Sequence, residues 1–215
     1  MTNPHTFSFV DLCGFTSLTG AHGDEDAAAI AFKFYAMAEA ALVADTRVVK
    51  RIGDAVMLRA SAPVDCVRTV LGLVDAIETE HLFPTFRCGV HAGPAVETGG
   101  DYLGAAVNLA ARVAAYAQSG EILCTHSVAT ELDAYGLRAI AVGPARFKNV
   151  PGETALFQVE RAPKSSASIT TDPVCRMRVD AARAPARLPY EGRTFSFCSF
   201  ACAQAFARDP DSYAR

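Results

Sequence analysis

TFSFVDLCGFTSL, residues 6–18, joins an apolar stretch to a glycine and decides how the N-terminal part of the chain is interpreted. The first seven residues favour a buried β-strand, because aromatic and β-branched side chains lead into an acidic residue and a glycine that break the pattern. Asp11 is therefore expected at the exit of this strand. Considered alone, an aspartate in such a place is usually an ordinary turn residue.

Helical and extended patterns alternate downstream of this strand. Residues 23–26 open a helix whose acidic first turn is followed by apolar side chains at helical spacing, namely Ile30, Phe34, Met37 and Ala41. VVKRIGDAVMLRA, residues 48–60, predicts a β-hairpin with Gly53 and Asp54 at its tip. Further helices are predicted over 63–80 and 104–118, and further strands over 86–92, 121–124, 137–142 and 154–159.

Helices that return onto one antiparallel or mixed sheet predict an α+β fold of ferredoxin-like character. Asn108 and Arg112 lie four residues apart on the helix predicted over 104–118, so they project from one face of it. The buried stripe of that helix is expected to consist of Val107, Ala110, Ala111 and Ala114. Taken singly, these polar residues, like Lys50 and Asp101, would pass as solvated surface groups.

Three motifs together give these residues a specific interpretation. FVDLCGFTSL (9–18), KRIGDAVM (50–57) and GDYLGAAVNLAAR (100–112) occur in the order and spacing of class III adenylyl and guanylyl cyclases, and the chain resembles that family from about residue 5 to 160. The resemblance implies that Asp11 and Asp54 hold two divalent cations, Mg²⁺ or Mn²⁺. It further implies that Lys50 and Asp101 select the base. Asn108 would orient the ribose, and Arg112 would contact the phosphate that undergoes substitution.

The implied reaction converts ATP to 3',5'-cyclic AMP and pyrophosphate. The ribose 3'-oxygen attacks the α-phosphate in line, so catalysis depends mainly on positioning and charge. Two carboxylates suit hard cations, and a fixed guanidinium suits the charge that grows on the phosphoryl oxygens. Backbone N–H groups at residues 13–16, including Gly14, Phe15 and Thr16, are candidates for holding the phosphates.

The choice of base follows from the direction of the hydrogen bonds. Adenine presents an acceptor ring nitrogen and a donor amino group, which a lysine donor and an aspartate acceptor complement. Guanine reverses this pattern, so Lys50 and Asp101 predict ATP over GTP. The resemblance also implies a head-to-tail homodimer, in which Asp11 and Asp54 of one chain face Asn108 and Arg112 of the other.

A second motif lies near the C-terminus, where Cys175, Cys198 and Cys202 occur in DPVCRM and FCSFACAQAF. A helix beginning near Ser199 would place Cys198 and Cys202 at its positively polarised end, which favours thiolate ligands. Residues 170–215 resemble the YHS or TRASH-like family of metal-binding domains, a treble-clef-like ββα module. Arg176 replaces the glycine usual after the first cysteine.

This second resemblance implies a soft transition metal, with Zn, Cu or Fe as candidates. Three cysteines leave a tetrahedral site one ligand short, so water, Asp172 or the backbone would supply the fourth, whereas Cu(I) is satisfied by two or three sulfurs. Buried thiols without any metal are the alternative. The four remaining cysteines are expected in the core, and the five histidines, which do not cluster in sequence, receive no role.

The predicted domain organisation is a catalytic domain at 1–161, a linker at 162–169 and a metal-binding module at 170–215. A net charge of -3 and the absence of a dense basic face argue against nucleic-acid or membrane partners. The N-terminus carries no secretory pattern, no apolar run is long enough to span a bilayer, and seven cysteines favour thiols over disulfides. A cytoplasmic location is therefore expected.

Three functional hypotheses remain open at this level. The first is an active, cytoplasmic adenylate cyclase for signal transduction, whose output is tuned by the metal or redox state of the C-terminal module. The second is a catalytically silent nucleotide- or metal-binding sensor that uses the cyclase fold as a dimerisation scaffold. The third treats the C-terminal module as a unit for metal delivery or storage.

Overall fold

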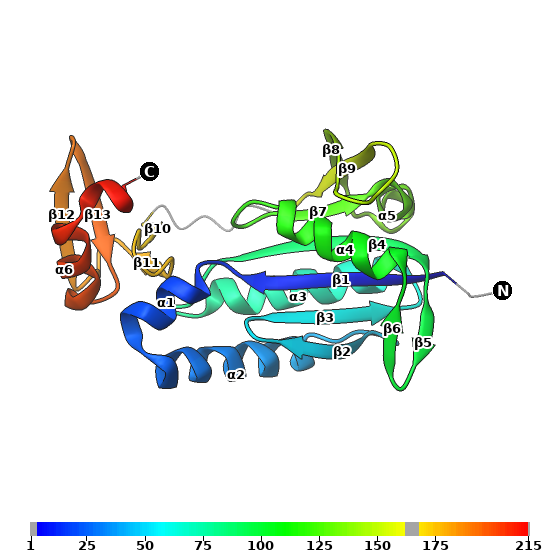
Figure 1. Ribbon diagram of the computed structural model, residues 1–215, viewed down its shortest axis with the longest axis horizontal. Coiled ribbons are helices and arrows are strands. Elements are labelled where there is room, and N and C mark those ends of the chain that lie inside the picture. The colour runs from blue at the N-terminus through cyan, green and yellow to red at the C-terminus, as the bar shows by residue number, and fades with distance from the viewer. Residues whose placement is uncertain (1–3, 162–167, 215) are drawn as a thin grey trace. The chain divides into compact units, whose positions relative to one another are not determined.

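The computed structural model describes residues 4–161 and 168–214, and these form two compact units (Figure 1). The sheet unit comprises residues 4–11, 35–75 and 86–161. The tail unit comprises residues 12–34, 76–85 and 168–214. Most of the predicted linker falls in the stretch 162–167, outside the described residues, so the domain boundaries remain a prediction.

A seven-stranded mixed sheet forms the centre of the sheet unit, with the strand order β2-β3-β1-β4-β7-β9-β8. Strands β4 and β7 pair in parallel, whereas β1–β3, β2–β3, β7–β9 and β8–β9 pair antiparallel. Its strands are β1 Pro4–Leu12, β2 Arg47–Ile52, β3 Ala55–Ala60, β4 Phe86–Pro94, β7 Ile122–Thr125, β8 Ala139–Ala145 and β9 Thr154–Val159. This architecture confirms the predicted α+β class.

Helices and a small hairpin complete the sheet unit. The hairpin is β5 Val96–Thr98 with β6 Asp101–Leu103. The helices are α3 Pro63–Thr79, α4 Ala105–Tyr116, α5 His126–Leu132 and a 3₁₀ turn, Asp133–Tyr135, together with the second half of α2 Asp24–Ala40. The prediction omitted α5. On α4, Val113 is buried and Ala111 only partly buried, so the expected apolar stripe was slightly misplaced.

Helix α4 approaches strand β4 so closely that only glycine fits at the contact. A Cβ atom at Gly89 would lie 2.0 Å from the backbone nitrogen of Ala114 and 2.7 Å from the carbonyl oxygen of Ala110. Because both obstructing groups are backbone atoms, they cannot rotate away as a side chain would. Gly89 therefore fixes the distance between the sheet and the helix that carries Asn108 and Arg112.

Replacing Gly89 by alanine should destabilise the fold strongly. Forcing extra volume into such a contact costs about 3 kcal/mol, which lowers the melting temperature by about 6–12 °C for a chain of this size. Gly72→Ala in α3 is the matched control, because its Cβ would meet nothing closer than 3.7 Å and alanine favours helix. Thermal unfolding of both variants measures the effect, and equal melting temperatures would show that the close approach is not required.

The tail unit combines both ends of the chain. It contains α1 Phe15–His22, the first half of α2, and residues 76–85, with the C-terminal elements β10 Ile169–Thr171, β11 Arg178–Asp180, β12 Ala186–Tyr190, β13 Arg193–Phe197, α6 Phe200–Arg208 and a 3₁₀ turn, Pro210–Ser212. Hairpin β12–β13 followed by α6 is the predicted ββα module. Leu18 of α1 and Ala27 of α2 are buried in the same core as Phe197 and Phe206.

Candidate functional site

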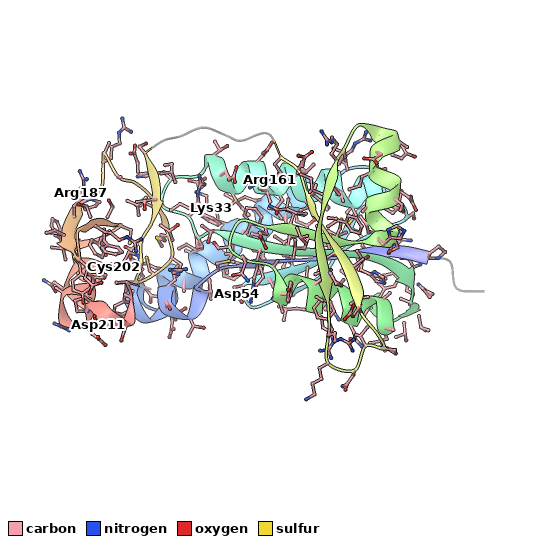
Figure 2. All side chains as sticks on the ribbon, turned by 90° about the horizontal axis from the view of Figure 1, so that it is seen from above. Lys33, Asp54, Arg161, Arg187, Cys202 and Asp211 are labelled. Carbon is pink, nitrogen blue, oxygen red and sulfur yellow. The ribbon has the colours of Figure 1, made fainter. Side chains whose placement is uncertain are left out.

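Asp11 and Asp54 lie at the same end of the paired strands β1 and β3. Asp11 pairs with Ala55, and Asp54 immediately precedes Ala55 in the turn of the β2–β3 hairpin. Gly53 adopts φ 59° in that turn, a conformation that glycine reaches without a steric cost. The sequence prediction of a hairpin with Asp54 at its tip is thus confirmed (Figure 2).

The carboxyl groups of Asp11 and Asp54 interact electrostatically. Burial raises the pKa of Asp54 above its usual value, and the negative charge of Asp11 raises it further, while Arg87 opposes the shift. A site that penalises a second negative charge is one in which a bound cation relieves repulsion. Carboxylate oxygens are also the ligands that Mg²⁺ and Mn²⁺ prefer, so this donor set fits the divalent ions expected from the sequence.

Arg87 on β4 is a participant that the sequence analysis missed. Its Nε atom donates a hydrogen bond to Oδ2 of Asp11 at 2.7 Å, and its Nη2 atom also lies 2.7 Å from that oxygen. A further contact of 3.4 Å reaches the carbonyl of Ala115 in α4. A charged residue between buried Phe86 and buried Cys88 in a strand was the available signal, because such a charge needs a partner.

Replacing Asp54 by asparagine should stabilise the protein at neutral pH when no divalent cation is added. The pKa of Asp54 is higher in the folded protein than in the unfolded chain. Protonation of Asp54 therefore adds to the free energy of unfolding, fully below the ordinary aspartate pKa, and this contribution is lost as the pH rises through the folded-state pKa. Asparagine resembles the protonated acid at every pH. Thermal unfolding in magnesium-free buffer measures this effect. The melting temperature of Asp54→Asn should equal that of the wild type in acid and exceed it at pH 7. A difference in melting temperature that does not change with pH would contradict this prediction.

Lys50 and Asp101 are brought together from distant positions in the sequence. The Lys50 ammonium lies 2.7 Å from Oδ2 of Asp101, whose Oδ1 accepts a hydrogen bond from the Tyr102 backbone at 2.7 Å. The hydrogen bond from Lys50 lowers the pKa of Asp101. Both side chains remain more than a third exposed, 35% and 40%, so the pair is accessible to a ligand and contributes little to stability.

Asn108 and Arg112 project from α4, one turn apart. Neighbouring Ala106, Val107 and Ala110 are buried against Phe7 and Met57 of the sheet, which turns the opposite side of the helix outward. Accordingly, Asn108 is exposed and Arg112 partly exposed. The predicted shared face is present.

The Gly14–Thr16 segment forms the beginning of α1 in the tail unit. Gly14 adopts φ 76°, the left-handed region, and accepts the first helical hydrogen bond from Leu18 at 2.9 Å. Helix α1 starts at the next residue, Phe15, and Thr16 is exposed. The N–H groups of a first helical turn lack helical partners and can bind anions, so a phosphate role for these three residues remains a prediction.

Cys175, Cys198 and Cys202 form one cluster in the tail unit, where Figure 2 marks Cys202. The sulfur of Cys198 lies 3.3 Å from that of Cys175 and 3.7 Å from that of Cys202. Hydrogen bonds from the other two thiols lower the pKa of Cys202. Ser199 caps α6 by accepting a hydrogen bond from the Cys202 backbone, as expected for a helix beginning there.

Asp172, one of the candidates for a fourth ligand, has a different function. It is fully buried, and Oδ1 accepts from the backbone of Val174 at 2.8 Å and of Cys175 at 3.4 Å, while Oδ2 accepts from Cys198 at 2.8 Å. The carboxylate thus joins the two loops that carry the cysteines. His22, which the sequence analysis left without a role, lies against the sulfur cluster instead.

The remaining cysteines agree with the expected packing role in three cases. Cys66, Cys88 and Cys124 are buried in the sheet unit, and burial raises the pKa of Cys66 and of Cys124 to about 12. Thiols in such surroundings are poor nucleophiles and poor ligands. Cys13 is only partly buried.

Two family models match this chain. The adenylate and guanylate cyclase catalytic domain matches residues 2–161, and the YHS domain matches residues 170–215. The chain therefore belongs to the adenylate and guanylate cyclase family and carries a C-terminal YHS domain. Both resemblances predicted from the sequence motifs are confirmed.

Several curated relatives are named as adenylate cyclases. The chain is 36% identical over 160 residues to the pH-sensitive adenylate cyclase MT1302 of Mycobacterium tuberculosis, which covers 73% of this chain and 40% of that protein. It is 33% identical over 130 residues to an adenylate cyclase of Streptomyces griseus, covering 60% and 32%. The chain spans less than half the length of these relatives.

Solved cyclase structures share the fold. The adenylyl cyclase CyaB of P. aeruginosa superposes with a TM-score of 0.64 at 21% identity, covering 76% of this chain and 97% of that one. A Trypanosoma brucei adenylate cyclase, described in its monomeric state, gives a TM-score of 0.68 at 21% identity, covering 76% and 90%. Within the described residues, no helix combines the length and apolar character needed to cross a membrane.

Proposed function

We propose that this protein is an adenylate cyclase, which converts ATP to 3',5'-cyclic AMP and pyrophosphate. The observation that carries the proposal is the pair of acidic side chains, Asp11 and Asp54, at one end of the β1–β3 pair. The raised pKa of Asp54, caused by burial and by the charge of Asp11, supports a cation site. The Lys50–Asp101 pair supplies the second element, a donor and an acceptor suited to adenine.

In the proposed reaction a bond forms between the ribose 3'-oxygen and the α-phosphorus, and the bond from that phosphorus to the bridging oxygen breaks. The proton of the 3'-hydroxyl leaves to solvent, and pyrophosphate is the leaving group. Two bound Mg²⁺ or Mn²⁺ ions would lower the pKa of that hydroxyl and neutralise the triphosphate. Asp11 and Asp54 would hold these ions, and the backbone N–H groups of Gly14, Phe15 and Thr16 would contact the phosphates.

Arg112 and Asn108 complete the proposed site. The guanidinium of Arg112 is permanently charged and stabilises the negative charge that develops on the phosphoryl oxygens. Asn108, one helical turn before Arg112 on α4, orients the ribose through its side-chain amide. Their exposure on α4 supports contact with a substrate bound outside their own helix.

Selection of adenine is assigned to Lys50 and Asp101. The ammonium of Lys50 donates a hydrogen bond to Asp101 at 2.7 Å. Because the pair is exposed, exchanging part of this contact for hydrogen bonds to the base costs little. Lys50 would donate to a ring nitrogen, and Asp101 would accept from the adenine amino group.

The proposed assembly is a head-to-tail homodimer with two equivalent active sites. Asp11, Asp54, Lys50 and Asp101 act from one copy of the chain, and Asn108 and Arg112 act from the second copy. A two-fold arrangement then repeats the same site twice. The YHS domain is proposed to regulate this output through its metal or redox state.

A catalytically silent sensor is the second candidate, and one observation favours it. Two nitrogens of Arg87 lie 2.7 Å from one oxygen of Asp11, Oδ2, so the guanidinium offsets part of the negative charge that would attract a cation. Such a protein would bind nucleotide without turning it over. The two candidates differ in product formation and not in binding.

The deciding experiment is cyclic AMP formation by purified protein supplied with ATP and Mg²⁺ or Mn²⁺. Asp54→Ala, prepared in parallel, gives the background. We expect product formation that depends on the cation and greatly exceeds this background. A rate equal to that of Asp54→Ala, accompanied by measurable nucleotide binding, would establish the silent sensor.

A further inference from the structure

The imidazole of His22 meets the three cysteines in the core of the tail unit. Its Nε2 atom lies 3.4 Å from the Cys198 sulfur and 3.7 Å from the Cys202 sulfur. The ligand atoms of His22, Cys175, Cys198 and Cys202 all lie within 4.8 Å of one another. Three of them come from the YHS domain, whereas His22 belongs to the segment matched by the cyclase family.

Three of these separations fit the edges of a tetrahedron around one metal ion, and the sulfurs of Cys175 and Cys198, at 3.3 Å, lie somewhat closer together than such an edge. With metal–sulfur bonds of about 2.3 Å and a metal–nitrogen bond of about 2.0 Å, tetrahedral sulfurs lie about 3.8 Å apart and sulfur and nitrogen about 3.5 Å apart. The Cys198–Cys202 and Cys198–His22 separations of 3.7 and 3.4 Å match these values. Disulfide bonding would require sulfurs at about 2.0 Å, and all three cysteines are free.

The protein scaffold holds His22 in this place. It is the last residue of α1, which Gly23 ends at φ 87° while donating its N–H to the carbonyl of Thr19 at 2.8 Å. One turn earlier, Leu18 is completely buried in the core that contains Cys175 and Cys202. The helix is therefore anchored by packing, and its last turn presents the imidazole to the sulfurs.

A second contact ties the other end of α1 to the same loop. Arg176, next to the ligand candidate Cys175, packs on Gly14, where a Cβ atom would lie 2.3 Å from Cγ of Arg176. Arg176 itself has φ 64°, a left-handed conformation that favours glycine, so the arginine is held there at some cost in backbone strain. Both ends of α1 thus contact residues around the cysteine cluster.

The donor set indicates the class of metal. Three thiolates and one imidazole form a closed tetrahedral set typical of structural Zn²⁺ sites, whereas Cu(I) is satisfied by the sulfurs alone and would leave His22 aside. Asp172 already uses both oxygens on backbone N–H groups of the cysteine loops. It orients these loops in the manner of an outer-shell residue and leaves the fourth position to His22.

We propose that His22 is the fourth ligand of a Cys₃His zinc site, and that the bound ion fastens helix α1 to the YHS domain. The ligation does not depend on whether the chain is a cyclase. Because α1 begins at the Gly14–Thr16 segment, the same ion would also limit the motion of the segment proposed to contact phosphates. That second consequence rests on the proposed function.

Metal affinity measured on the full chain tests the ligation directly. Zn²⁺ binding is followed by competition with a chromophoric chelator, and Co²⁺ is used as a spectroscopic substitute whose visible bands report tetrahedral coordination. Loss of a direct ligand by His22→Ala should weaken Zn²⁺ binding by about 100-fold or more and change the Co²⁺ bands. His22→Cys supplies a new fourth ligand and should restore tight, tetrahedral binding.

His81→Ala is the matched control, because His81 is an exposed histidine of the same unit, and it should bind both ions like the wild type. Hydrogen exchange supplies a readout that needs neither nucleotide nor turnover. Zn²⁺ should slow exchange in residues 15–22 of the wild type but not of His22→Ala. Wild-type affinity, Co²⁺ bands and exchange protection in His22→Ala would overturn the proposal, and so would failure of His22→Cys to restore binding in a folded protein.

Discussion

Asp54→Asn is expected to lower the turnover of ATP by about 1,000-fold, equivalent to about 4 kcal/mol of transition-state stabilisation. The substitution keeps the size of the side chain and removes the negative charge that would hold a cation. The same variant should be more stable than the wild type at neutral pH without added cation, since the pKa of Asp54 is raised by burial and by Asp11. If Asp54→Asn is both less active and more stable than the wild type, the Asp54 carboxylate serves catalysis and not the stability of the fold.

Initial rates at saturating ATP and Mg²⁺ measure this loss. Asp133→Asn is a matched control, because Asp133 is an exposed aspartate in the 3₁₀ turn, Asp133–Tyr135, of the same sheet unit. It should retain the wild-type rate. Retention of more than about a tenth of the wild-type turnover by Asp54→Asn would remove this residue from the proposed cation site.

Lys50→Glu combined with Asp101→Asn is expected to reverse base preference. The double variant places an acceptor where ATP needs a donor and a donor where ATP needs an acceptor. We expect kcat/KM for ATP to fall by about 100-fold, with a gain for GTP, which presents the opposite hydrogen-bonding pattern. Competition between equal concentrations of ATP and GTP, with both cyclic products measured by mass spectrometry, reports the ratio.

Arg51→Gln is the control for this experiment. Arg51 neighbours Lys50 on β2 and also forms a salt bridge, at 2.8 Å to Glu39, so its loss tests the effect of breaking a nearby exposed ion pair. The ATP to GTP ratio should remain that of the wild type. An unchanged ratio in the Lys50/Asp101 variant would mean that these two residues do not read the base.

Local sequence patterns predicted the elements that position the carboxylates. The strand before Asp11 and the hairpin around Gly53 and Asp54 depend on short-range preferences, namely a β-prone run that breaks at a glycine and a two-residue turn. The structure contains both elements. The residue roles came from the family resemblance, and these await the experiments above.

Helix α1 was missed because its stability is tertiary. Its eight residues include two threonines, a serine and a glycine, which are weak helix formers. The helix gains its stability from Leu18, which is buried in a core shared with residues such as Phe197 and Phe206. No local window of sequence contains that contact.

The two missed polar residues, Arg87 and His22, share the same explanation. Arg87 hydrogen-bonds Asp11, which is 76 residues away in the sequence, and His22 contacts Cys198, which is 176 residues away. The cysteines were recognisable because Cys198 and Cys202 are close in sequence, while a ligand so distant leaves no spacing to detect. Asp172 was considered as a ligand, but its two oxygens accept hydrogen bonds from the backbone N–H groups of Val174, Cys175 and Cys198.

Complementation between two inactive variants tests the shared active site most directly. Asp54→Asn and Arg112→Ala, each expected to be inactive as a homodimer, are co-expressed at equal levels. Half of the dimers are then mixed, and each mixed dimer has one intact site, so the activity should recover to about a quarter of the wild type. Co-expression of Asp54→Asn with Asp11→Asn should recover nothing, because both lesions affect the same half of the site. Mixed dimers of Asp54→Asn and Arg112→Ala that are equally inactive would contradict a site built from two copies.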